Sequence, residues 1–102
     1  MTSSPTDVSN PLAKGVTVTA DALVVELLDG RALTVPLAWY PRLFHATAEE
    51  RADWQLIGGG EGIHWSRVDE DVSVEGLLAG RRSHESTPSL ARWLATRPGV
   101  PA

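Results

Sequence analysis

The chain has 102 residues, which suits one domain with a single modest core, and it carries a net charge of −4. This acidic balance argues against a nucleic-acid surface, which requires clustered Lys and Arg, and the only lysine is Lys14. The lack of cysteine excludes disulfides, thiolate metal sites and cysteine nucleophiles. No apolar run approaches the roughly 18 residues that span a bilayer, and residues 1–14 lack the apolar core of a secretory signal. We therefore expect a cytoplasmic protein that does not contact a membrane.

The first half of the chain predicts an arm followed by three strands. Residues 1–14 are rich in Ser, Thr and Pro, which is typical of a mobile arm, so the domain is expected over residues 15–82. Residues 16–20 and 23–28 are rich in β-branched and other apolar residues, and the Asp29-Gly30 pair predicts a two-residue hairpin turn into residues 31–35. In that register one face carries Leu23, Val25, Leu27, Ala32 and Thr34, and the other carries Val24, Glu26, Leu28, Arg31, Leu33 and Val35.

The second half predicts short helices around two further strands. Residues 39–43 begin a helical turn, and Thr47-Ala48-Glu49-Glu50 matches a capping box for a helix over residues 48–54. Residues 55–57 and 62–65 read as strands, and Ser73 caps a helix that ends at Gly80. Residues 83–102 form a linker and a final helix that starts at Thr87-Pro88. These elements predict an α+β fold, with N-terminal hairpin strands in a small antiparallel sheet packed against two or three short helices.

A dense aromatic cluster occupies Trp39, Tyr40, Pro41, Arg42 and Leu43. Two adjacent aromatic residues rarely point the same way, so one is expected in the core and the other near the surface. Arg42 is placed to stack on an aromatic ring or to pair with Glu70 or Asp71. The cluster is interpreted either as a structural corner or as an aromatic–arginine contact surface, a combination enriched at protein interfaces.

The acidic run Asp69-Glu70-Asp71 begins like a calcium loop, but the rest of such a loop is missing. Val74 stands where the sixth position requires Gly, and Gly80 stands where the twelfth requires a bidentate Glu. A magnesium site is the weaker alternative. The preferred interpretation is a turn whose carboxylates favour the positive end of the following helix, with no metal or other cofactor.

His64 is the strongest candidate for base or ligand chemistry among the three histidines. No two histidines have a spacing that suggests shared metal ligation, and Ser66 lies in no nucleophile-elbow motif. Residues 58–62 are rich in glycine but match no phosphate-binding loop. We expect His64 to pack against Trp65 with one ring nitrogen hydrogen-bonded, and we assign no catalytic residue.

Four motifs together resemble a known family. They are the Asp-Gly-Arg hairpin, Val-Pro-Leu-Ala-Trp-Tyr-Pro-Arg-Leu, Gly-Ile-His-Trp and Asp-Glu-Asp-Val-Ser-Val-Glu-Gly-Leu-Leu-Ala-Gly. In this order and spacing they resemble the bacterial domain-of-unknown-function family 2442, over residues 16–82. The resemblance implies a compact α+β fold with an antiparallel sheet. It also implies a bacterial protein encoded beside a second small protein, in a pair suspected to be a toxin–antitoxin module.

The leading functional hypothesis is a non-enzymatic protein-interaction module, antitoxin-like, that binds a small protein encoded nearby. Its acidic balance suits a basic partner. The expected partner-binding residues are Trp39, Tyr40, Arg42, His64, Trp65, Asp69, Glu70 and Asp71. Self-association as a two-fold dimer is also expected. The alternatives are a DNA-associated transcriptional regulator, in which the C-terminal helix or a dimer supplies the contacts, and a small hydrolase-type enzyme that uses His64.

Overall fold

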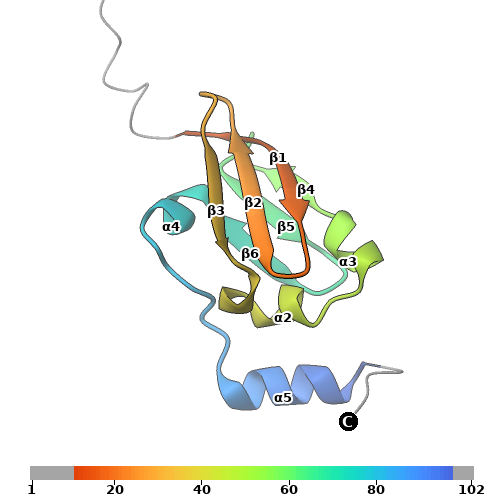
Figure 1. Ribbon diagram of the computed structural model, residues 1–102. Coiled ribbons are helices and arrows are strands. Elements are labelled where there is room, and N and C mark those ends of the chain that lie inside the picture. Colours follow the sequence, from red (N-terminus) through yellow and green to blue (C-terminus); the bar gives the residue numbers. More distant parts are fainter. Residues whose placement is uncertain (1–10, 98–102) are drawn as a thin grey trace, which may run out of the picture.

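The computed structural model describes residues 11–97, which form two three-stranded antiparallel sheets and several short helices (Figure 1). The predicted α+β class is confirmed. Within these residues the elements are β1 (Ala13–Val18), β2 (Ala22–Leu27), β3 (Ala32–Pro36), η1 (Leu37–Trp39), α2 (Pro41–Phe44), α3 (Ala48–Ala52), β4 (Gln55–Ile57), β5 (Gly62–Trp65), β6 (Glu70–Ser73), α4 (Val74–Leu78) and α5 (Thr87–Ala95).

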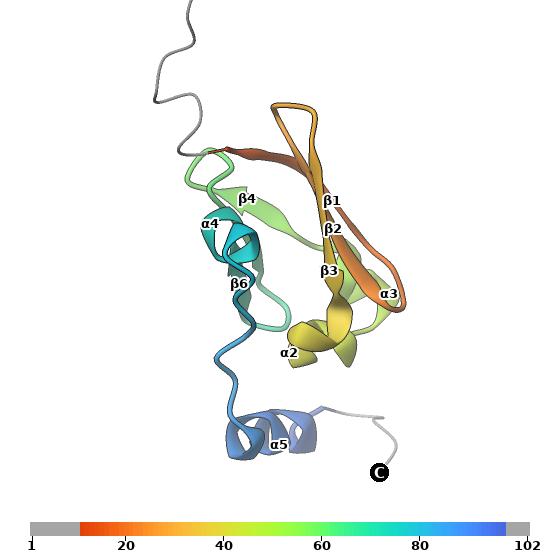
Figure 2. The same cartoon turned by 60° about the vertical axis from the view of Figure 1, so that its left-hand side comes forward.

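The two sheets face each other, and the core fills the space between them. The first sheet has the order β1-β2-β3 and the second the order β4-β5-β6. Figure 2 shows the sheets as two layers, with α2 and α3 at one end. The largest fully buried side chains come from the central strands and from the segments that join them: Leu23, Val25, Leu27, Leu37, Leu43, Ile63, Trp65, Val68 and Val74. Burial of these apolar groups is the main favourable contribution to folding.

The loop between β2 and β3 corrects the predicted register. Leu27 N donates to Arg31 O at 2.8 Å, and Gly30 N donates to Leu27 O at 3.1 Å, so the loop has three residues rather than two. Gly30 has a φ of +97°, as the third residue of such a loop requires. The extra residue moves every β3 side chain to the opposite face.

The corrected register places the larger β3 side chains on the core side. Val25 pairs with Leu33, and Leu23 pairs with Val35. Leu33 and Val35 are therefore packed against the core, whereas Ala32 and Thr34 are exposed. The sequence prediction placed Ala32 and Thr34 on the same face as Leu23 and Val25, and Leu33 and Val35 on the other, because it assumed a turn of two residues.

The strand β1 begins at Ala13, two residues before the expected domain boundary at residue 15. Ala13 is buried, and its backbone N–H donates to the carbonyl of Gly60 at 2.8 Å, which joins β1 to the loop of the second sheet. A Cβ at Gly60 would lie 2.6 Å from Ala13 O, so only glycine fits this close approach. The rest of the predicted arm, residues 1–10, lies outside the described residues.

The predicted helix caps are confirmed. Thr47 Oγ1 accepts from Glu50 N at 3.1 Å, and Glu50 Oε1 accepts from Thr47 N at 2.8 Å, which completes the capping box of α3. Ser73 Oγ accepts from Gly76 N at 2.9 Å at the start of α4. Gly80 follows α4 with a φ of +74°. The helix α3 ends at Ala52 instead of Trp54, whereas α5 begins at Thr87 as predicted and is capped by Ser86.

Replacement of Gly30 by Ala should lower the free energy of unfolding by about 1–2 kcal/mol, because an L-residue is strained at positive φ. No atom lies within 4 Å of the added Cβ, so the loss would come from the backbone alone. Urea unfolding would measure it. The control is Leu28→Ala, which changes an exposed side chain of the same loop and should cost much less. Equal stability of Gly30→Ala and the wild type would contradict the assigned loop.

Candidate partner-binding site

A polar cleft of about 540 Å³ lies between β6, the Tyr40–Arg42 region and the segment of residues 81–86. The start of α5 contributes to its rim through Ser89. Five of the eight predicted site residues line this cleft: Tyr40, Arg42, Asp69, Glu70 and Asp71. Tyr40 and Arg42 thus meet residues 69–71, which follow them by at least 27 positions in the sequence.

Trp39 and Tyr40 diverge as predicted, and both hold the segment of residues 81–83. Tyr40 is buried, and its hydroxyl donates to the carbonyl of Arg81 at 3.0 Å. Burial and the nearby Glu70 charge raise the pKa of Tyr40. Trp39 is half-buried, with the guanidinium of Arg82 stacked 4.8 Å from its ring centroid. Its carbonyl accepts from Ser83 N at 3.1 Å. The aromatic pair therefore binds a stretch of peptide backbone as well as a cationic side chain.

Arg42 is the most connected side chain of the cleft. Its Nε donates to Glu85 Oε1 at 2.5 Å, and its Nη2 donates to Glu85 Oε2 at 3.3 Å. Its Nη1 donates to the carbonyl of Val68 at 3.1 Å. The predicted partners Glu70 and Asp71 are wrong, because the segment after α4 returns over the cleft and brings Glu85 closer. Arg42 lowers the pKa of Glu85, as does a hydrogen bond donated by Ser89 Oγ.

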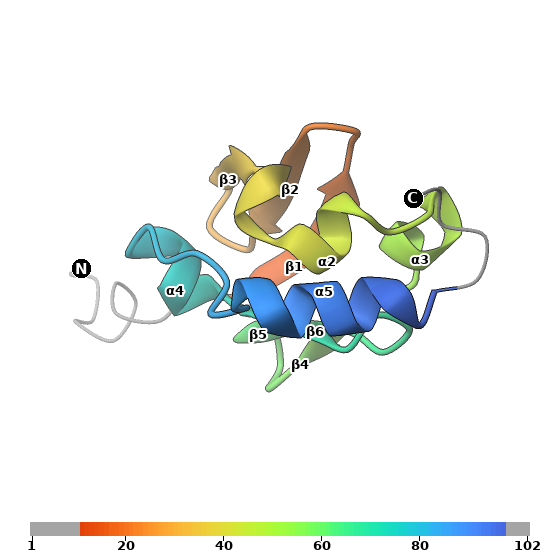
Figure 3. The ribbon, with the colours of Figure 1, turned by 90° about the horizontal axis from the view of Figure 1, so that it is seen from below.

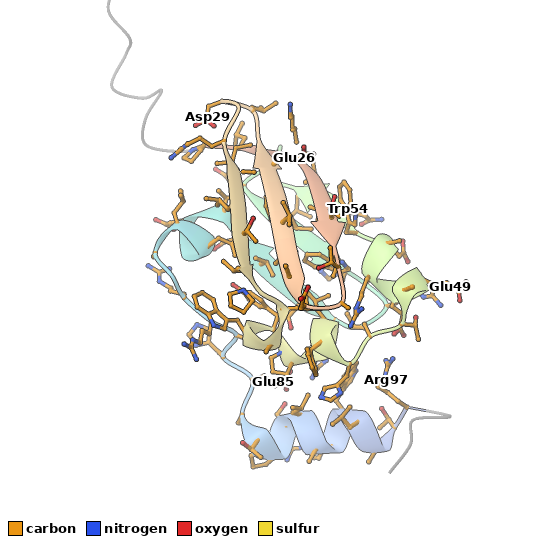
Figure 4. The ribbon with its side chains drawn as sticks, in the orientation of Figure 1. Glu26, Asp29, Glu49, Trp54, Glu85 and Arg97 are labelled. Atoms are coloured by element: carbon orange, nitrogen blue, oxygen red, sulfur yellow. The ribbon has the colours of Figure 1, made fainter. Side chains whose placement is uncertain are left out.

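The helix α5 docks on the rest of the chain through charged and aromatic contacts. Trp93 lies between two guanidinium groups, 5.1 Å from Arg42 and 4.5 Å from Arg97. Arg97 Nη2 also pairs with Glu50 Oε1 at 2.6 Å, and both side chains are largely buried. Figure 3 shows α5 running across the end of the two-layer domain, and Figure 4 shows Glu85 and Arg97 near its two ends. No α5 residue is fully buried, so the helix is held by Trp93 and by the ion pairs of Glu85 and Arg97, which flank it.

Glu70 lies inside the domain rather than in an acidic turn. The turn is formed by Asp69, which has a φ of +54°, and Glu70 begins strand β6 opposite Trp65. The β6 side chains alternate, so Glu70 and Val72 point inward, while Asp71 points outward. This corrects the prediction that all three acids form a turn at the start of α4. The sequence signal for this burial is the spacing of Val68, Glu70 and Val72, since residues two apart in a strand share one face.

The inward position of Glu70 changes its acidity. Burial raises its pKa from 4.5 to about 7, and the charge of Glu85 adds to that shift. The positive charge of Arg42 and the Asp71 backbone amide lower it in part. Within residues 11–97, Glu70 forms no ion pair and accepts no side-chain hydrogen bond. The cleft therefore contains a carboxyl group close to half ionised near neutral pH.

His64 and Trp65 lie outside the cleft and on opposite faces of β5. His64 Nδ1 lies 2.5 Å from Asp71 Oδ1, its cross-strand neighbour on the outer face. Trp65 is fully buried, and its Nε1 donates to the carbonyl of Arg51 at 3.0 Å. The predicted packing of His64 against Trp65 is wrong, because successive residues of a strand point to opposite faces. The expected hydrogen bond to one ring nitrogen of His64 is present.

Across residues 11–97, no three His, Asp or Glu side chains gather closely enough to hold a metal ion. No helix in that part of the chain has both the length and the apolar character needed to cross a membrane.

Comparison with known proteins identifies the family. The family of proteins of unknown function DUF2442 matches residues 13–83. The chain belongs to this family. The match includes both sheets and most of the cleft, but it ends before Glu85 and α5. The DUF2442 domain is thus covered in this chain by a segment that follows it.

Two solved structures resemble this DUF2442 chain. A crystal structure of a protein of unknown function from Rhodospirillum rubrum has a TM-score of 0.62 at 24% identity, covering 78% of this chain and 96% of that one. A solution NMR structure of an uncharacterized protein from Chromobacterium violaceum has a TM-score of 0.62 at 27% identity, covering 85% of this chain and 76% of that one. No curated protein matches the sequence.

Replacement of Trp93 by Ala should loosen α5 without unfolding the two sheets, because the helix has few other attachments. Hydrogen–deuterium exchange of residues 87–95 should accelerate at least tenfold, while exchange in β2 and β5 stays unchanged. The control is Arg92→Ala, which changes an exposed residue of the same helix. Unchanged protection of α5 in Trp93→Ala would contradict the role of the two arginine contacts.

Replacement of Glu70 by Gln should alter the pH dependence of stability. The folded state holds an extra proton on Glu70 between pH 4.5 and about 7, so the resulting stability is present below pH 4.5 and is lost as the pH rises through 7. Relative to the wild type, Glu70→Gln should gain up to about 3 kcal/mol between pH 4.5 and 8 in urea unfolding. Titration of the Glu70 carboxyl carbon by NMR serves as the control. A stability difference that does not vary with pH would contradict the assigned burial.

Proposed function

We propose that this cytoplasmic DUF2442 domain is a non-enzymatic protein-interaction module. Its partner would be a second small bacterial protein encoded nearby, which it covers in the manner of an antitoxin. The observation that supports the proposal is the binding of residues 81–86 by Trp39, Tyr40 and Arg42. Hydrogen bonds to peptide backbone, stacking on an aromatic ring and a forked ion pair are contacts by which interaction domains hold their partners.

The chemistry of the site favours recognition over catalysis. Arg42 is committed to Glu85 and the carbonyl of Val68, which positions peptide segments rather than a reacting group. On the outer face, His64 and Asp71 are arranged like the base and the orienting acid of a hydrolase. Within residues 11–97, no serine or threonine hydroxyl hydrogen-bonds to His64, so the pair has no side-chain nucleophile in contact with it.

The charge of the chain suggests the chemistry of the partner. A net charge of −4 would steer a basic protein toward this domain. Asp69 and Asp71 are exposed at the rim of the cleft, where they would meet that protein first.

Co-expression with the product of the neighbouring gene should yield a complex that elutes together from a size-exclusion column. Replacement of Asp71 by Lys should raise the dissociation constant at least about tenfold, because it reverses a charge at the rim of the cleft. The matched control is Glu49→Lys, on α3 and away from the segment of residues 81–86 (Figure 4). Light scattering on the same samples would report the predicted self-association. A chain that elutes without its neighbour would contradict the proposal.

A further inference from the structure

Glu70 is a buried acid without a side-chain partner among residues 11–97. It is 9% exposed, and it lines the cleft together with Tyr40 and Arg42. A buried carboxylate is normally paired or hydrogen-bonded, because removal of a charge from water is costly. Across residues 11–97, no ion pair reaches Glu70 and no side chain donates a hydrogen bond to it.

Two of the three arginines that line the cleft, Arg42 and Arg82, make contacts with groups other than Glu70. Arg42 donates hydrogen bonds to Glu85 and to the carbonyl of Val68, and its guanidinium also lies 4.0 Å from Asp69 Oδ2 and over the ring of Trp93. Arg82 lies over the ring of Trp39. Arg81 is exposed and forms no ion pair within the described residues.

The other titratable groups that line the cleft are three carboxyl groups besides Glu70, one phenol and one imidazole. Glu85 lines it from the segment of residues 81–86, Asp69 from the end of the β5–β6 turn, Asp71 from strand β6, and Tyr40 from the end of η1. His84 lies on the same rim. Glu70 and Glu85 therefore line the same cleft, and the guanidinium of Arg42 hydrogen-bonds to Glu85 and not to Glu70.

We propose that the cleft binds a lysine or arginine side chain of the partner protein against the carboxylate of Glu70. This inference rests on the proposed function, and it specifies the partner's chemistry at one position. A cationic side chain would supply the opposite charge and the side-chain hydrogen-bond donors that no residue from 11 to 97 gives to Glu70. Because the pKa of Glu70 is raised to about 7, arrival of the cation would favour the ionised form and release a proton at neutral pH.

A positively charged side chain fits the site better than a metal ion. Divalent metals bound by oxygen require several ligands around one point. No group of three acidic or histidine side chains suited to a metal occurs in the described part of the chain. An ammonium or guanidinium needs only one carboxylate, which Glu70 provides at the wall of the cleft.

NMR titration of the whole chain with small probes tests the inference directly. The probes are N-acetyl-lysine methylamide, N-acetyl-arginine methylamide and the uncharged N-acetyl-norleucine methylamide. A cationic probe should shift the Glu70 carboxyl carbon and the Glu70 and Asp71 amides, and it should lower the pKa of Glu70. The norleucine probe should leave these signals unchanged. Glu70→Gln should abolish the response, and the control Glu49→Gln should keep it. Equal shifts with all three probes, or the same shifts with magnesium chloride, would overturn the inference.

The protein complex separates this inference from the proposed function. If the neighbouring gene product co-elutes with the wild-type chain, Glu70→Gln should weaken that complex at least tenfold, and Glu49→Gln should not. A complex that Glu70→Gln leaves unchanged would overturn the inference and leave the interaction function standing. A response to the cationic probes without any co-eluting neighbour would uphold the cation site and refute the proposed partner.

Discussion

The face-to-face packing of the two sheets is the constraint on which the rest of the structure depends. Each sheet has three short strands, and a sheet of this size needs a covered apolar face to be stable. Leu23 and Leu27 of β2 and Ile63 and Trp65 of β5 provide that cover for each other. The cleft lies at the margin of this contact, where β6 ends the second sheet. Its shape is therefore set by the packing of the layers, and its chemistry by the side chains that project past them.

Local features of the fold could be predicted because they depend on neighbours in the sequence. The capping box at Thr47, the cap at Ser73 and the glycine that ends α4 each involve bonds across a few residues. The side chains of β3 that face the core could not be predicted in this way. The Asp29-Gly30 pair is compatible with a loop of two residues or of three, and the two loops place opposite side chains in the core. Strand β6 could not be predicted, because Asp and Glu are poor strand formers in isolation. Pairing with β5 holds Glu70 and Asp71 in the strand.

The candidate site was predicted in its parts but not in its assembly. The divergence of Trp39 and Tyr40 follows from their adjacency, and the affinity of Arg42 for acids and aromatic rings follows from its chemistry. The identity of its partners, Glu85 and Trp93, depends on how residues 81–86 return across the cleft. No local pattern encodes that path. Both partners also follow the part of the chain that matches the family, so the family resemblance offered no guide to them.

The three-residue hairpin loop at residues 28–30 has an evolutionary consequence. Loss or gain of one residue there would exchange the faces of β3, placing Ala32 and Thr34 in the interior and Leu33 and Val35 in solvent. Related sequences can therefore vary the composition of this hairpin more freely than its length. Where the length does change, it should change by two residues, or the alternation of β3 should be inverted in the same lineage.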